Sequence, residues 1–588
     1  MAAVLVVAGA VHWHLSARWS ANPDEVPHLL AGLAYIHAGQ YYHYSVNPPL
    51  VKNVAAFPAW LMGLRGPELG EQPGRPELRA GWNYAERYPE AVWRALVAGR
   101  RAMFLFTLVG ALAVYRLARD TVGRSAGTLA AGLWLTLPPV VGQGAMVQCD
   151  IAGAAVGALA VSSIHRWTTG DSWWRCLETS LTLSLAILTK YTWLLLIYVL
   201  VTWALIDVLR RPPAGRSLRR RLSQLALMFA VMLAMLGAGF QFQDWGSSLR
   251  DGQWRSANFQ RFSGTDNPAG IGAPWINSLA SLPVPLPRPM LVGLDIQMFD
   301  LQRPKPAFYL GRWHDRGSWI YYPSTLAAKL PLAVVLLLLF GIAACLSNRA
   351  AMPLLYTPAI LLAVLATSRD MNEHVRYAYG VLPFVAILAG LGSRRLWLLG
   401  RVWTRSARAR QAKVGHGLAL AFQCSVTILP VMSMSAATLR PARSFSYTNR
   451  LFGNTERAGR YIGGSAVDWD HLWIEARRWV EQHDIATDRL VALRPRWTPL
   501  TLCGWRVRSQ PLHDFTEPLV ALVPVDKRQR LEQSGYRCFQ VTPHAGTIAG
   551  GLEVYRIDSP ATLSGWPELV ALELVENQRG QASLMSSL

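Results

Sequence analysis

Two carboxylates and an imidazole follow closely on the apolar N-terminal stretch of this chain. Asp24 and His28 are four residues apart and Glu25 and His28 are three apart, so a helix would place all three side chains on one face. Such a face can supply a general base or ligands for a metal ion. Acids in the first turn also complement the helix dipole in many proteins, so the position of this face in the molecule has to decide between the two interpretations.

The segment that carries these residues, NPDEVPHLLAGLAYIHAGQYYHYSVNPPLVKN from Asn22 to Asn53, is too polar to lie in lipid. Asn22 as the N-cap and Pro23 at the first helical position predict the start of a helix, and Gly39 predicts its end. An aromatic, His-containing turn and a Pro-Pro pair then lead to Lys52, which brings a cation close to the acids in sequence.

The composition predicts an integral membrane protein. Of the 588 residues, 52% are hydrophobic and only 16% are charged, and the mean hydropathy is +0.19; a soluble domain has about 25% charged residues. The formal net charge of +22 does not indicate a nucleic-acid-binding protein, because it is concentrated in short loops such as 210–221 and 394–413, and the sequence contains no nucleic-acid module. Basic loops of this kind face the cytoplasm and contact anionic lipid headgroups.

About eleven apolar segments are candidates for transmembrane helices. They lie near residues 2–18, 98–117, 126–142, 150–166, 176–190, 191–209, 222–240, 325–346, 351–367, 376–398 and 416–437. If the N-terminus is inside, every basic cluster falls on the cytoplasmic side, as the positive-inside rule requires. We therefore predict a transmembrane module over residues 1–439, with an external catalytic loop over 19–97 and a second large external loop over 241–324.

Residues 440–588 are expected to form an external, soluble α+β domain. A helix is predicted over residues 470–483, and strands are predicted over 489–493, 519–523 and 552–557. Cys503 and Cys538 both lie in this region; they either pair in an oxidising compartment or remain two core thiols.

Four sets of ionisable residues converge on the external face under this topology. Asp24 and Glu25 follow the first span, Asp150 begins the fourth, Lys190 lies between the fifth and sixth, and residues 369–377 form the mouth of the tenth. An isolated lysine at such a place is usually a snorkelling residue. Ionisable groups close to membrane depth are costly, however, so their convergence on one face predicts a functional site.

The order and spacing of these residues resemble the polytopic glycosyltransferases of the GT-C fold that use polyprenyl-phosphate sugars. The most similar branch is glycosyltransferase family 39, the dolichyl-phosphate-mannose-protein mannosyltransferase-like group, to which the aminoarabinose transferases are related. The matching pieces are Asp24-Glu25 with His28 and Gly32, Asn47-Pro48-Pro49-Leu50 with Lys52, Asp150, Leu188-Thr189-Lys190-Tyr191, Tyr321-Tyr322-Pro323 with Lys329 and Pro331, and Arg376-Tyr377 with Leu382-Pro383. The later run from Ser465 to Asp470 departs from the family pattern at Ala466 and Asp470, so no role is transferred to it.

The resemblance implies a polytopic GT-C-like membrane fold and a reaction at the external face, with inversion at the anomeric carbon. Transfer from a polyprenyl phosphate needs a base for the acceptor and positive charge for the departing phosphate. The implied catalytic residues are Asp24, as general base, with Glu25 and Asp150 in support. The implied contacts to phosphate or substrate are Lys52, Lys190, Arg376, Tyr321, Tyr322 and His374. A divalent metal ion as cofactor stays open, with Asp24, His28 and Asp150 as its candidate ligands.

The expected partners are a polyprenyl-phosphate-linked sugar, an acceptor that is a protein, a lipid or a glycan, and the lipids of a bacterial inner membrane. Two other classes of protein are consistent with a charged helix bundle. One is a transporter or flippase of lipid or sugar. Two observations oppose this class: the charges cluster at one face, and the sequence shows no inverted halves. The other is a non-catalytic scaffold whose external domain binds cell-wall polymer or a partner.

Overall fold

The computed structural model describes residues 1–66, 76–170, 172–210, 218–263, 279–347, 353–367, 372, 374–409, 439–493, 500–505 and 518–571, with scattered positions between 414 and 432. Most of the described chain before residue 410 is helical. The first half contains α1 (Ala2–Ser16), α2 (Glu25–Ala38), α3 (Pro49–Leu61), α4 (Pro76–Arg87), α5 (Pro89–Ala102), α6 (Phe104–Thr121), α7 (Arg124–Thr136), α8 (Pro138–Gly144), α9 (Cys149–Thr169), α10 (Trp173–Thr189), the 3-10 helix η1 (Tyr191–Leu194), α11 (Leu195–Arg210) and α12 (Leu218–Gly239).

The chain continues through α13 (Ala257–Ser263), α15 (Arg288–Leu301), β1 (Ala307–Tyr309), β2 (Arg312–His314), α16 (Tyr321–Lys329), α17 (Leu332–Leu346), α18 (Pro353–Thr367), the 3-10 helix η3 (Val375–Val381) and α19 (Leu382–Ala409). Its last part contains the 3-10 helix η7 (Gly464–Ala466), α21 (Trp473–Gln482), β3 (Leu490–Ala492), β4 (Leu519–Pro524), α22 (Val525–Gln533), α23 (Cys538–Val541), β5 (His544–Ile548), β6 (Leu552–Ile557) and α24 (Pro560–Leu563).

A helix lies at each of the first ten predicted spans, while most of 416–437 lies outside the described residues. By length and composition, three helices in the described part can cross a membrane: Pro89–Thr121, Leu218–Gly239 and Val375–Ser406. Helices α8 and α9 would together add a fourth, but the chain bends by 117° between them. Further apolar helices are shorter, so the count of eleven spans stays a prediction.

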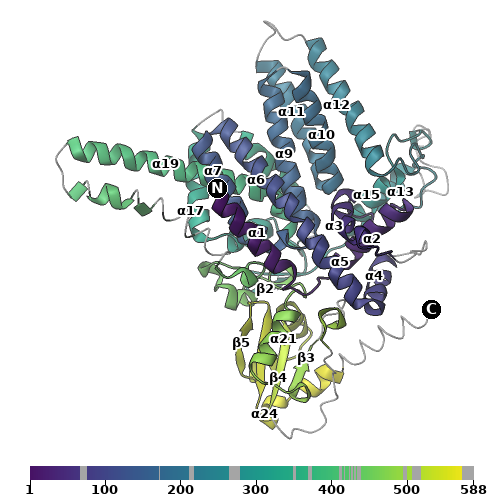
Figure 1. Cartoon of the computed structure of the whole chain (residues 1–588), viewed down its shortest axis with the longest axis vertical. Coiled ribbons are helices and arrows are strands. Elements are labelled where there is room, and N and C mark those ends of the chain that lie inside the picture. The colour runs from purple at the N-terminus through teal and green to yellow at the C-terminus, as the bar shows by residue number, and fades with distance from the viewer. Residues whose placement is uncertain are drawn as a thin grey trace.

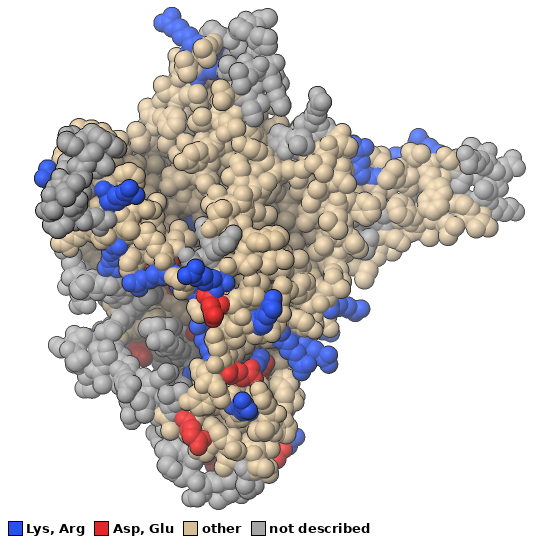
Figure 2. Space-filling model, turned by 180° about the vertical axis from the view of Figure 1, so that it is seen from behind, with Lys and Arg blue, Asp and Glu red and all other residues tan. Residues whose placement is uncertain are grey.

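Figure 1 shows the helices as one body, with the four-stranded sheet at its lower end. At the upper end, α9, α10, α11 and α12 run side by side. On the face shown in Figure 2, the visible Asp and Glu side chains all lie in the lower half, toward the sheet. The upper half, where this face shows no Asp or Glu side chain, is the part that a bilayer can surround.

Two glycines let α17 and α19 cross in close contact. A Cβ added at Gly341 would lie 1.9 Å from the carbonyl oxygen of Leu388, and one added at Gly392 would lie 2.0 Å from that of Leu337. Each helix therefore presents a glycine to the backbone of the other, as is common where membrane helices pack through small residues. This crossing sets the position of α19 and of η3 just before it.

The sheet has the strand order β3-β4-β6-β5, with β3 parallel to β4 and the other pairs antiparallel. Successive residues of β4 point to opposite faces of the sheet, each of which carries its own hydrophobic core. Leu522 packs in the core that contains Trp473 of α21, and Val523 packs in the core that contains Trp566. Strands thus form at the three predicted segments and α21 lies within the predicted helix. The strand β5 was missed, as was the hairpin of β1 and β2, which turns at Leu310 and Gly311 with φ of 52° and 80°.

Of the two cysteines that were considered as a pair, Cys538 is a buried free thiol. Cys503 ends the 3-10 helix Leu500–Cys503, and its side chain lies outside the described part of the structure.

Gly341→Ala is expected to lower the free energy of unfolding by about 1–3 kcal/mol, because the added methyl group meets the rigid backbone of α19 rather than a side chain that can turn away. Thermal unfolding of the detergent-solubilised protein measures this loss. Gly417→Ala is the matched control, because a Cβ at Gly417 meets nothing within 4 Å. Equal stability of the two variants would show that α17 and α19 do not pack at these glycines.

Candidate active site

The turn between α1 and α2 presents the first candidate residues. Helix α2 begins at Glu25 and its N-cap is Asp24. Asn22 and Pro23, which were predicted to start this helix, therefore precede it. The Asn22 side chain shapes this turn, because its Oδ1 accepts a hydrogen bond of 3.0 Å from the backbone N–H of Asp24. The helix ends as predicted, with Gly39 as C-cap in the left-handed region at φ of 62°.

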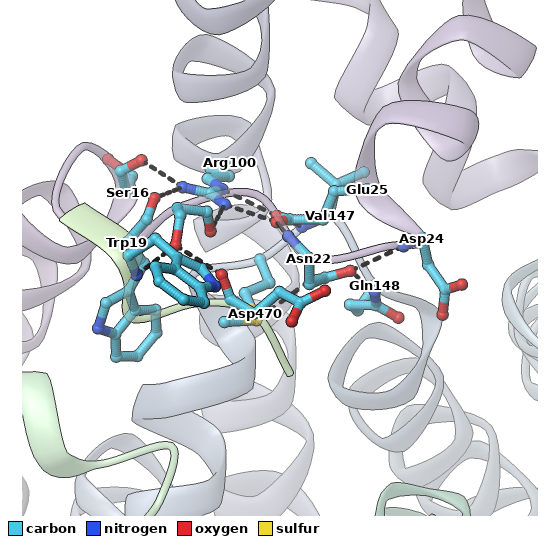
Figure 3. Close-up of polar contacts among 12 residues, drawn as sticks. Ser16, Trp19, Asn22, Asp24, Glu25, Arg100, Val147, Gln148 and Asp470 are labelled. Carbon is cyan, nitrogen blue, oxygen red and sulfur yellow. Dashed lines mark hydrogen bonds and ion pairs between the residues drawn. The ribbon is translucent and has the colours of Figure 1, made fainter. Parts of the chain in front are cut away.

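Glu25 does not share a face with Asp24, and in this respect the sequence prediction was wrong. Its carboxylate is fully buried and binds Arg100 of α5, with Nε–Oε1 and Nη2–Oε2 distances of 2.8 and 2.5 Å. It also accepts a hydrogen bond of 2.8 Å from the backbone N–H of Val147. Figure 3 shows that the Asp24 carboxylate points away from this pair. Glu25 therefore holds the turn and does not face the candidate site.

Arg100 ties the end of α1 to the same pair. Its guanidinium also donates to the backbone carbonyls of Ser16, Trp19 and Ser20 at 3.1, 2.6 and 2.8 Å (Figure 3). A buried charge is tolerated when it is paired and its remaining N–H groups are satisfied. Arg100 was not among the predicted site residues, because 75 residues separate it from Glu25 in sequence.

Asp24 faces a different cation, Arg376 of η3. The distance from Arg376 Nη2 to Asp24 Oδ2 is 3.1 Å, although 352 residues separate the two in sequence. The other carboxylate oxygen accepts a hydrogen bond of 2.9 Å from the hydroxyl of Tyr44. About a fifth of the Asp24 side chain remains exposed, so the carboxylate is fixed on two sides and open on another.

Arg376 joins Asp24 to Asp150 and Lys190. Its Nε lies 3.8 Å from Asp150 Oδ2 and has no hydrogen-bond partner among the described residues, while its Nη1 donates to Gln148 Oε1 at 3.2 Å. Lys190, the C-cap of α10, binds Asp150 in the first turn of α9 at 2.6 Å. Four predicted residues, one from each convergent set, thus form one network of two carboxylates and two cations.

The break between α8 and α9 serves both parts of this arrangement. Val147 in the break donates its backbone N–H to Glu25, and Gln148 binds both Arg376 and the side chain of Asn22, the latter at 2.9 Å. Sequence analysis did not single out Gln148 or Tyr44. Neither residue type has a spacing that distinguishes it from an ordinary polar or aromatic residue.

The surroundings of Asp24 favour its charged form. Burial raises the pKa of the Asp24 carboxyl, but the positive charge of Arg376 and the hydrogen bond from Tyr44 outweigh burial, so the net pKa is lowered from its ordinary value. Asp24 is therefore an anion at neutral pH. A carboxylate in this state can accept a proton or bind a cation, although its basicity is low.

His28 lies one turn beyond Asp24 and is buried against the ring of Tyr44, with a centroid distance of 4.6 Å. Burial is the main cause that lowers the pKa of His28, to about 3, so this imidazole is neutral at physiological pH. In the part of the chain that the structure describes, no three His, Cys, Asp or Glu side chains gather closely enough to hold a metal ion. The guanidinium of Arg376 occupies the space between the carboxylates of Asp24 and Asp150. The described residues therefore do not fit a metal centre.

Lys52 lies close to the site, but it is fully buried. Its ammonium donates to the hydroxyl of Tyr35 at 2.8 Å and to the carbonyls of Tyr44 and Asn47 at 2.5 and 2.6 Å. These bonds hold the turn in which Tyr44 has a φ of 52°. The Lys52 ammonium is thus occupied by protein oxygens and does not face a phosphate as expected. Lys52 instead positions Tyr44, which binds Asp24.

The remaining predicted residues lie at the start of α16 and just before η3. Tyr321 and Tyr322 begin α16 and are buried, with ring centroids 5.0 Å apart. His374 precedes Arg376 and its Nδ1 lies 2.7 Å from Ser465 Oγ. Of the predicted mouth of the tenth span, residues 369–371 and 373 lie outside the described residues.

Part of the chain matches the model of a known family. Residues 95–237 match the family model described as dolichyl-phosphate-mannose-protein mannosyltransferase. This match confirms the resemblance drawn from the sequence, and the matched part carries Arg100, Asp150 and Lys190. No curated protein matches the chain.

Several solved structures are similar to the chain at low identity, each with a TM-score below 0.5. ArnT from Cupriavidus metallidurans in the apo state is 14% identical, with a TM-score of 0.46 over 94% of this chain and 97% of that one. The same protein bound to undecaprenyl phosphate is 15% identical, with a TM-score of 0.45 and the same coverage. The Archaeoglobus fulgidus oligosaccharyltransferase in the apo form is 14% identical, with a TM-score of 0.42 over 74% of this chain and 55% of that one.

Glu25→Gln is expected to destabilise the protein by about 3–5 kcal/mol, because it leaves the Arg100 guanidinium buried without a counter-charge. Thermal unfolding in detergent measures the effect. Glu456→Gln is the control, because it removes the same kind of charge from a pair with Arg443 at the surface, where such pairs contribute about 0–1 kcal/mol. Unchanged stability of Glu25→Gln would contradict the structural role assigned to Glu25.

Proposed function

We propose that the chain is a membrane glycosyltransferase that moves a sugar from a polyprenyl-phosphate donor to an acceptor at the external face of a bacterial inner membrane. The observation that carries the proposal is a network of three ion pairs. Arg376 lies between Asp24 and Asp150, and Asp150 also binds Lys190. The family match over residues 95–237 supports the same reaction class. The network combines an ionised acid with two cations, which are the groups that this transfer needs.

Arg376 and Lys190 are proposed to bind the phosphate of the donor. Arg376 Nε is a buried donor without a hydrogen-bond partner among the described residues. The Lys190 ammonium, which has three N–H groups, donates one of them to Asp150. A phosphate oxygen can take these N–H groups because a guanidinium and an ammonium both form charge-assisted hydrogen bonds with phosphate. Their charge stabilises the negative charge that grows on the phosphate as the sugar leaves.

Asp24 is proposed to act as the general base. The acceptor hydroxyl would give its proton to the Asp24 carboxylate while its oxygen bonds to the anomeric carbon. The bond between that carbon and the phosphate oxygen breaks, and its electron pair leaves with the polyprenyl phosphate. Inversion at the anomeric carbon follows from a single displacement of this kind. Asp150 keeps Arg376 and Lys190 in place, and no step needs a metal ion.

Asp24→Asn is expected to lower the release of polyprenyl phosphate by about 10²–10⁴-fold, the usual contribution of a general base. The measurement is release from a panel of polyprenyl-phosphate sugars by the purified protein in lipid, with candidate acceptors supplied. Asp488→Asn, at an exposed position, is the control. Equal release by the parent and Asp24→Asn would refute Asp24 as the base.

Tyr44→Phe is expected to move the acidic limb of the pH profile of kcat/KM to higher pH. The Tyr44 hydroxyl is one of the groups that lower the pKa of Asp24, so its removal raises that pKa, and the carboxylate then becomes protonated at a higher pH. Tyr42→Phe serves as the control, because the Tyr42 hydroxyl binds Asp244 instead. If the acidic limb lies at the same pH in the parent, Tyr44→Phe and Tyr42→Phe, then Asp24 is not the group whose protonation sets that limb.

A further inference from the structure

A short segment of the last region, Gly464–His471, lies directly on the network. Ser465 Oγ is 2.7 Å from His374 Nδ1, and the Trp469 ring stacks on that of His374 with a centroid distance of 5.6 Å and an interplanar angle of 16°. The Cζ atom of Arg376 lies 3.3 Å from the centroid of the Trp469 ring. The face of the guanidinium that joins Asp24 to Asp150 is thus covered by an indole ring.

This segment is tied to the turn that carries Asp24. Ser20 Oγ donates to the carbonyl oxygen of Asp470 at 2.6 Å and accepts from the backbone N–H of Trp473 at 2.9 Å, while its own N–H donates to the carbonyl of His471 at 3.0 Å. Arg18 binds Glu475 of α21 nearby. Figure 3 shows Asp470 beside this turn.

The backbone of the segment is held in an unusual conformation. Asp470 has a φ of 58°, in the left-handed region, and its N–H donates to Asp468 Oδ1 at 3.2 Å. The Lys329 ammonium donates to the carbonyl of Ala466 from the other side. A residue in the left-handed region that is not glycine persists where its surroundings determine it, and here bonds on both sides fix the ring of Trp469 in place.

We propose that Trp469 is a positioning residue for Arg376, through which the last region of the chain contributes to the active site. All N–H groups of a guanidinium lie in its plane, so a ring on its face attracts the cation and excludes water without using a donor. The edge of Arg376 stays available to Asp24, Asp150 and the donor phosphate. The inference deepens the proposed function and rests on it.

An aromatic ring and an aliphatic side chain at position 469 distinguish this role from simple packing. Trp469→Phe keeps a π face, whereas Trp469→Leu keeps an apolar cover without one. We expect Trp469→Leu to lower kcat/KM about tenfold and to weaken binding of polyprenyl phosphate by a similar factor, with Trp469→Phe within about threefold of the parent. The acidic limb of the Trp469→Leu profile should also rise, because a looser Arg376 lowers the pKa of Asp24 less.

Trp479→Leu is the matched control, because Trp479 lies in the same region and stacks on His483, with a centroid distance of 4.1 Å. Turnover is measured in lipid and binding of polyprenyl phosphate alone by titration, with thermal unfolding of each variant alongside. Equal losses in Trp469→Leu and Trp469→Phe, or no loss in either, would overturn the positioning role while leaving the proposed function intact. A folded parent that neither binds nor turns over any donor would overturn both.

Discussion

The buried ion pair of Glu25 and Arg100 is the interaction on which the placement of the candidate site depends. Neither side chain is exposed, so each charge needs the other, and the remaining N–H groups of Arg100 need acceptors. The backbone carbonyls at the end of α1 provide them. One guanidinium therefore fixes α1, α5 and Glu25, the first residue of α2, together. Asp24, the residue just before Glu25, has little freedom in where it points.

The same requirement explains why Asp24 and Glu25 serve different purposes. Two adjacent carboxylates at a buried turn would repel each other if both faced one space, and each is instead directed to its own cation, Arg376 or Arg100. The Glu25 pair is closed, because protein groups satisfy it from every side. The Asp24 pair is partly open and extends through Asp150 to Lys190. In the proposed reaction, the donor phosphate would take the place of a carboxylate beside Arg376 and Lys190, and the burial of Arg376 would strengthen that contact.

Much of this arrangement was predictable from local patterns, and the rest was not, for a physical reason. Hydropathy located helices at ten of eleven segments, β-branched and apolar runs located three of the four strands of the sheet, and the external mouths of the spans located the four members of the network. Local spacing placed Glu25 beside His28, but the choice of side was made by Arg100, 75 residues away. Lys52 was likewise assigned to phosphate, because the sequence does not show that the Tyr35 hydroxyl and the carbonyls of Tyr44 and Asn47 surround its ammonium. Pairing partners of buried charges are tertiary facts, and spacing along one helix does not encode them.

The division of the chain that hydropathy suggests does not divide the site. The membrane module was expected to end near residue 439, yet Ser20 in the first loop binds both Asp470 and Trp473, and Trp469 covers the guanidinium that holds Asp24. A buried arginine stays desolvated only if its faces are covered by groups that exclude water. Trp469, which lies beyond residue 439, covers one face of Arg376. Trp469 contacts Arg376, and Arg376 binds Asp24, so a change at position 469 reaches Asp24 through the guanidinium.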